Sequence, residues 1–144
     1  MASESYPVIL LVMDDESEHS HAVHILAKYH FSNSLIRLRR ALDLARYFSD
    51  VDTSGNSSKL APELVIFSPS ETPVDQFCAS VEFARSQIKE TPLIVVAPSI
   101  DAEKMLAGFR LPLTYVIGRP MGFFKLLEAM QKLGMYWTVR RSPV

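Results

Sequence analysis

The stretch Pro62-Glu63-Leu64-Val65-Ile66-Phe67-Ser68 decides how this chain folds. Its central residues, 64–67, are apolar and partly β-branched, which is typical of a strand covered on both faces. Pro62 suits the start of such a strand, because the first residue can lack an N–H at little cost. Ser68 ends the strand. Ligands of open α/β sheets bind at the carboxyl ends of the strands, so the side chain at position 68 bears directly on function.

Similar runs, one of them weaker, occur along the rest of the chain. They predict strands at Val8–Met13, Ser34–Leu38, Leu93–Ala97 and Thr114–Gly118. Apolar residues recur at helical spacing within residues 19–30, 40–48, 74–88, 102–109 and 121–133. Strand and helix therefore alternate five times, which predicts an α/β protein with a parallel, doubly wound sheet and helices on both faces.

Length and composition indicate one soluble domain. The chain has 144 residues, of which 48% are hydrophobic and 22% charged. We expect a core at about residues 6–134 and a C-terminal tail at 135–144. The net charge of -1 argues against nucleic-acid binding. No apolar run is long enough to span a membrane, and the polar N-terminus is unlike a signal peptide. The single Cys78 fits a reducing compartment and the role of a small buried residue, so we expect a cytoplasmic protein.

Acidic residues follow the first strand. Asp14 and Asp15 are adjacent, and Glu16 comes next. Carboxylates at a strand end can hold a hard cation such as Mg²⁺. The same residues also favour the start of a helix, because negative charge stabilises the positive end of the helix dipole. Taken alone, the pattern leaves both interpretations open.

Several motifs together resemble a response-regulator receiver domain of the chemotaxis-regulator-like superfamily. They are Asp14-Asp15, the proline-led third strand, Thr91-Pro92-Leu93-Ile94-Val95-Val96, and Gly118-Arg119-Pro120. The resemblance covers nearly the whole chain and implies a flavodoxin-like (βα)5 fold with strand order 2-1-3-4-5. In that family the acidic pair binds Mg²⁺, and an aspartate ending the third strand accepts phosphate from a histidine kinase. A Thr or Ser ends the fourth strand, and Lys-Pro follows the fifth.

The chain departs from this pattern at three positions. Ser68 stands at the position of the phosphoacceptor, Ala97 at that of the hydroxyl residue, and Arg119 at that of the lysine. A serine without an adjacent base is a poor nucleophile for phosphoryl transfer, and alanine cannot bind a phosphoryl oxygen. We therefore expect a pseudo-receiver that is not an enzyme and has no cofactor. Mg²⁺ binding at Asp14 and Asp15 should be weak or absent, which would let Arg119 pair directly with either residue.

The long polar loop before the third strand and the ending Leu133-Gly134-Met135-Tyr136-Trp137 are similar to single-domain response regulators that partner bacterial phytochromes. This resemblance implies a homodimer formed through the last strand and helix, and a signalling partner such as a histidine kinase or a phytochrome. Aromatic and apolar residues there are expected at the interface, namely Phe123, Leu127, Met130, Tyr136 and Trp137. Alternatively, the Tyr-Trp tail folds back on its own domain.

The sequence predicts an atypical receiver of two-component signal transduction that acts as a phosphorylation-independent protein-interaction module. One alternative is a receiver that is still phosphorylated or metal-regulated at Asp14 or Asp15. A second is a small hydrolase that uses Ser68, although Phe67-Ser68-Pro69 lacks the glycines of a nucleophile elbow. The histidines cluster around the first helix, where one pair is spaced to bind a metal but surface positions are the simpler interpretation: His19, His21, His24 and His30.

Overall fold

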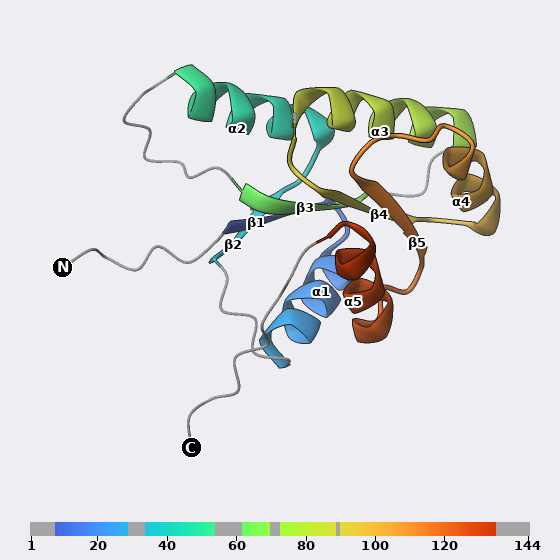
Figure 1. Cartoon of the computed structure of the whole chain (residues 1–144). Coiled ribbons are helices and arrows are strands. Elements are labelled where there is room, and N and C mark those ends of the chain that lie inside the picture. The colour runs from blue at the N-terminus through green and yellow to red at the C-terminus, as the bar shows by residue number, and fades with distance from the viewer. Residues whose placement is uncertain (1–7, 29–33, 54–61, 70–72, 89, 135–144) are drawn as a thin grey trace.

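The computed structural model describes residues 8–28, 34–53, 62–69, 73–88 and 90–134 of the chain (Figure 1). Within these residues, strands and helices alternate as the sequence predicts, and all five strands occupy their predicted positions. The elements are β1 (Val8–Met13), α1 (Glu16–Lys28), β2 (Ser34–Leu38), α2 (Ala41–Thr53), β3 (Pro62–Ser68), α3 (Val74–Gln87), β4 (Leu93–Ala97), α4 (Ile100–Ala107), β5 (Thr114–Gly118) and α5 (Phe123–Lys132). None of the described helices is long and apolar enough to cross a membrane.

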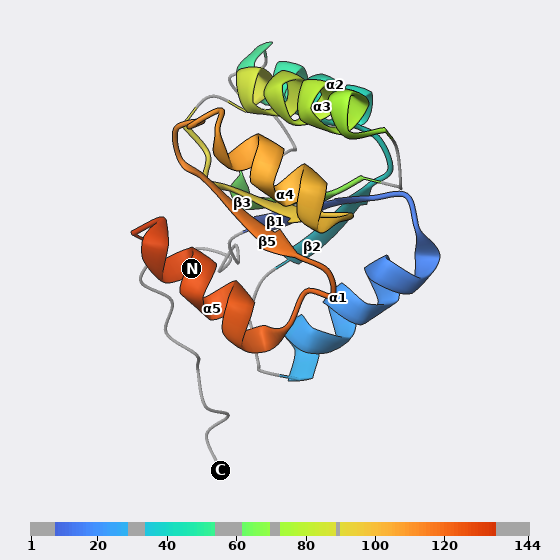
Figure 2. The same cartoon turned by 90° about the vertical axis from the view of Figure 1, so that its right-hand side faces the viewer.

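The five strands form one parallel sheet in the order β2-β1-β3-β4-β5, which confirms the predicted fold class. Parallel neighbours must be joined by crossovers, and here each crossover contains a helix. Helices α1 and α5 cover one face of the sheet, and α2, α3 and α4 cover the other (Figures 1 and 2). The carboxyl ends of all five strands consequently lie along one edge of the sheet.

Two hydrophobic cores lie on the two faces of the sheet. In β1, Ile9 and Leu11 pack in the core beneath α1 and α5, whereas Leu10 and Val12 pack in the core beneath α2, α3 and α4. This alternation follows the two-residue period of a strand. Cys78 is buried in the second of these cores, as predicted.

Two helices begin earlier than predicted because polar caps extend them beyond their apolar stripes, whereas α2 differs at its end, which is Thr53 and not residue 48. Helix α1 begins at residue 16 and not at residue 19, because the Asp15 carboxylate accepts a hydrogen bond from the Glu18 N–H at 3.0 Å. Helix α4 begins at residue 100 and not at residue 102, because Ser99 Oγ accepts from the Ala102 N–H at 3.1 Å. Such caps satisfy N–H groups of the first turn that have no partner within the helix.

A buried arginine ties α3 to the far edge of the sheet. Arg85 Nη2 donates to the Thr91 carbonyl at 2.7 Å, and Nη1 donates to the carbonyls of Pro112 at 3.1 Å and Leu113 at 3.0 Å. Burial lowers the pKa of the guanidinium. Leu113 has a left-handed backbone with φ of 51°, and its carbonyl also accepts from the Leu93 N–H at 2.9 Å. Arg85 thereby supports the turn that leads into β5.

Candidate functional site at the strand ends

Ser68 lies at the carboxyl end of β3, beside the end of β1. It pairs in register with Met13 and shares the α1/α5 face of the sheet with Leu64 and Ile66. Its exposed fraction is only 1%. A buried hydroxyl needs a hydrogen-bond partner, and the strand period restricts that partner to groups on the α1/α5 face.

The partner of Ser68 is Glu18, in the first turn of α1. The Ser68 hydroxyl donates to Glu18 Oε2, and Glu18 Oε1 forms an ion pair with Arg119 Nε. Among the described residues Arg119 Nε has no hydrogen-bond partner, so its contact with Glu18 counts as an ion pair. Arg119 Nη2 donates to the Pro69 carbonyl at 2.9 Å. One carboxylate therefore bridges the end of β3 and the residue that follows β5.

The expectation that Arg119 pairs with Asp14 or Asp15 is wrong. Asp15 is exposed and caps α1, and Asp14 is exposed with its carboxylate 3.9 Å from Arg39 Nη1. The reason lies in the position of the helix. Because α1 begins directly after Asp15, its first turn carries Glu18 across the end of β3 to the guanidinium. Glu18 was not predicted as a site residue. The signal in the sequence was its place three residues after the capping Asp15, which is the spacing of a capping box.

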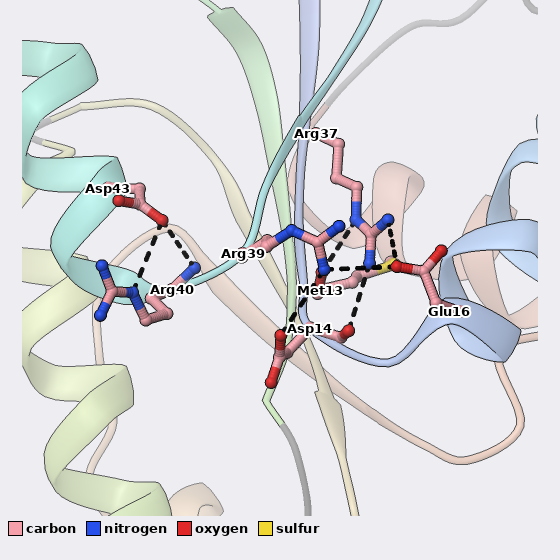
Figure 3. A network of polar contacts seen from close by, with 7 residues as sticks. All are labelled: Met13, Asp14, Glu16, Arg37, Arg39, Arg40 and Asp43. Atoms are coloured by element: carbon pink, nitrogen blue, oxygen red, sulfur yellow. Dashed lines mark hydrogen bonds and ion pairs between the residues drawn. The ribbon is translucent and has the colours of Figure 1, made fainter.

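Two arginines at the end of β2 contact the acidic residues that follow β1 (Figure 3). Glu16 Oε1 lies 2.8 Å from Arg37 Nη1 and 3.3 Å from Arg39 Nη1. Arg37 also donates from Nε to the Met13 carbonyl and from Nη2 to the Asp14 carbonyl, both at 3.2 Å. The hydrogen bond from Arg37 holds the pKa of Glu16 below its usual value. The arginines thus bind both side-chain and backbone oxygens at the end of β1.

This arrangement is electrostatically unfavourable for a divalent cation. A guanidinium close to a carboxylate repels a cation that approaches the same oxygens, although solvent screens part of the effect at exposed positions. Among the described residues, no three His, Cys, Asp or Glu side chains gather where they could hold a metal ion. The residues expected to supply oxygen ligands are Asp14 and Asp15, and weak or absent Mg²⁺ binding there stays a prediction.

A cavity of about 200 Å³ adjoins the Ser68–Glu18–Arg119 contact. Its other lining residues are Met13, Ser17, His21, Val96, Pro120 and Met121. His21 Nε2 is hydrogen-bonded to the Met121 carbonyl at 2.8 Å, so this nitrogen is the donor. The Ser68 proton is directed to Glu18, and the described contacts pair Ser68 with no histidine. This geometry gives no support to a serine hydrolase.

Ala97 lies apart from this contact, since it ends β4 in the core beneath α2, α3 and α4. It does line a groove of about 590 Å³ that runs along β5 between α4 and α5. Charged and aromatic side chains also line the groove, among them Glu103, Tyr115, Lys125 and Glu128. Tyr115 donates a hydrogen bond to Glu128 Oε1 at 3.2 Å, and partial burial raises the pKa of its hydroxyl.

The residues predicted for an interface differ from one another in how far they are buried. Met130 is buried in the core, so its assignment to the surface is wrong. Phe123 and Leu127 are half-buried on α5, and Tyr136 and Trp137 lie outside the described residues. Two other large apolar side chains are more exposed, namely Phe124 on α5 at 80% and Ile100 on α4 at 68%.

Comparison with known proteins establishes the fold. No protein-family model and no curated protein matches the chain. The bacteriophytochrome response regulator AtBRR superposes with a TM-score of 0.75 at 18% identity, over 92% of this chain and 96% of that one. The bacteriophytochrome response regulator RtBRR gives 0.71 at 18% identity, over 96% and 84%.

A third similar structure is the receiver domain of a sensor histidine kinase from Pseudomonas aeruginosa PAO1, which has a magnesium ion coordinated in its active-site cleft. It gives a TM-score of 0.63 at 10% identity, over 90% of this chain and 98% of that one. At such identities the similarity extends to the fold and not to the site. The chain has the fold of a response-regulator receiver domain.

Proposed function

We propose that this protein is an atypical receiver of two-component signal transduction that works as an interaction module without being phosphorylated. The observation that carries the proposal is the end of β3. There the strand ends in a serine and not in an aspartate or glutamate, and the serine hydroxyl is already hydrogen-bonded to Glu18. An acyl phosphate forms only on a carboxylate, and the side chain at position 68 supplies none.

The ends of the neighbouring strands support the same proposal. Arg37 and Arg39 contact the acidic residues after β1, where the metal ion of a working receiver would be needed. The side chain of Ala97, at the end of β4, has no donor for a phosphoryl oxygen. Each feature weakens a different requirement of phosphoryl transfer: the nucleophile, the metal ion and the stabilisation of the transferred group.

The test of this proposal is exposure of the full chain to Mg²⁺ with acetyl phosphate, followed by intact-mass measurement. We expect no mass increase. A covalent phosphate would overturn the proposal, and peptide mapping would then show whether Asp14 or Asp15 is the acceptor. Beryllofluoride with Mg²⁺ gives an independent readout, since we expect no large amide shifts at residues 14, 68 and 119.

An interaction module needs a binding surface, and we propose that β5 and α5 supply it in a homodimer. Phe124 exposes a large apolar area, and covering such a side chain is favourable by about 1.5–3 kcal/mol when burial is complete. A two-fold dimer would bring the same patch of each subunit together. The further partner proposed for this module is a signalling protein such as a histidine kinase or a phytochrome.

Light scattering at micromolar concentration tests the dimer. We expect a dimer for the wild type and a shift towards monomer for Phe124→Ser. Leu42→Ser is the matched control, because Leu42 is also an exposed apolar residue, at 48%, but lies on α2 across the sheet. A monomeric wild type, or equal weakening by both substitutions, would count against this surface.

A further inference from the structure

Glu18 has the contacts expected of a bound anion. Its Oε2 accepts from the Ser68 hydroxyl, and its Oε1 pairs with the Arg119 guanidinium. The side chain is 22% exposed, and that of Arg119 is 25% exposed. A hydroxyl donor and a guanidinium that converge on one carboxylate are the groups with which proteins also bind phosphate and other oxyanions.

We propose that Glu18 is the internal occupant of an anion-binding site formed by Ser68 and Arg119, and that it excludes inorganic phosphate and phosphoryl groups from the strand ends. The inference rests on the proposed function, because it concerns a site that is not phosphorylated. Two features would then keep phosphoryl groups from this site: position 68 has no aspartate, and the Glu18 carboxylate of α1 occupies the space.

The position of Glu18 makes it an effective competitor. Its backbone N–H is fixed by the Asp15 cap, so the side chain leaves α1 from a defined point. A tethered group competes at an effective concentration of about millimolar or more, whereas free phosphate must also pay the entropy of association. The charge adds to this advantage, because a carboxylate in place repels a second anion.

Arg119 is also held ready for an anion when Glu18 is absent. Its Nη2 is anchored on the Pro69 carbonyl, which fixes the guanidinium at the end of β3. The adjoining cavity of about 200 Å³ is wide enough for a tetrahedral oxyanion once the Glu18 side chain is shortened. Removing the Glu18 side chain should therefore expose a working anion site and not merely break an ion pair.

The experiment is a titration of the full chain with inorganic phosphate. Amide and arginine Nε signals are followed by ¹H–¹⁵N NMR at constant ionic strength. We expect Glu18→Ala to bind phosphate at least about tenfold more tightly than the wild type, with saturable shifts at Ser68 and Arg119. Glu18→Ala/Arg119→Gln should lose this binding. Glu82→Ala on α3 is the control, because it removes an exposed carboxylate on the opposite face of the sheet and should behave as the wild type.

Equal affinity in the wild type and Glu18→Ala, including no binding in either, would overturn the inference. So would a Glu82→Ala variant that gains binding to the same extent. If Glu18→Ala does not fold, Glu18→Ser carries the test, since it also shortens the side chain and removes its charge. Free phosphate is not a phosphodonor, so the result is independent of whether acetyl phosphate modifies the wild type.

Discussion

Arg85 offers the sharpest test of how α3 is held to the segments that lead into β4 and β5. The substitution Arg85→Met removes the guanidinium but keeps an unbranched apolar stem in the same space. The guanidinium contacts three backbone carbonyls, those of Thr91, Pro112 and Leu113. These contacts connect α3 to the segments that precede β4 and β5.

The expected loss of stability depends on which of the three carbonyls keep another hydrogen-bond donor after the substitution. The Leu113 carbonyl also accepts from the Leu93 N–H at 2.9 Å, and the Pro112 carbonyl accepts from Thr114 Oγ1 at 2.8 Å. Thr91 is the acceptor with no second donor among the described contacts, and its bond of 2.7 Å is also the shortest of the set. A hydrogen bond to a charged group contributes about 1.5–3 kcal/mol. Removing the buried positive charge also removes the cost of its desolvation, which offsets part of the loss of the other hydrogen bonds.

We therefore expect Arg85→Met to lower the free energy of unfolding by about 2–3 kcal/mol, which corresponds to a Tm lower by about 4–12 °C for a chain of this size. Urea denaturation followed by circular dichroism measures the change. The matched control is Arg46→Met on the exposed surface of α2, which should stay within about 0.5 kcal/mol of the wild type. Equal urea midpoints for the two variants would refute the reasoning.

Three further predictions concern single side chains. Asp15→Ala should lower the free energy of unfolding by about 1 kcal/mol through loss of the α1 cap, while Asp15→Asn, which can still cap, should retain most of it; equal losses in urea denaturation would contradict the capping role. The Cys78 thiol has a pKa raised mainly by burial and is only 3% exposed, so a disulfide reagent should label it at the rate of unfolding; fast labelling of the folded protein would disprove its burial. Glu16 has a pKa below its usual 4.5, so its ionised form stabilises the fold above that pH and this contribution is lost as the pH falls. The difference in unfolding free energy between the wild type and Glu16→Gln should therefore shrink on acidification. A difference that stays constant with pH would contradict the stabilising role of Glu16.

The strands and their order along the chain were predictable because their signals are local. Residues 64–67, for example, are buried whichever helices cover them, and their composition shows this directly. The parallel arrangement follows from alternation with helices, and the strand order came from the resemblance to receiver domains. Helix boundaries were less predictable, since caps such as Ser99 extend a helix beyond the apolar positions that reveal it.

The sequence by itself determined which residue ends each strand, and therefore that a serine stands at position 68. Only the tertiary structure decided what that serine and its neighbours contact. Glu18 and Ser68 are 50 residues apart, and so are Arg119 and Pro69. Their contacts depend on the face of the sheet to which each side chain points and on where α1 begins. Periodicity reveals the two faces of a strand, but which helix covers each face is settled by packing between distant segments. For the same reason Arg119 contacts Glu18, while arginines from β2 contact the acidic residues after β1.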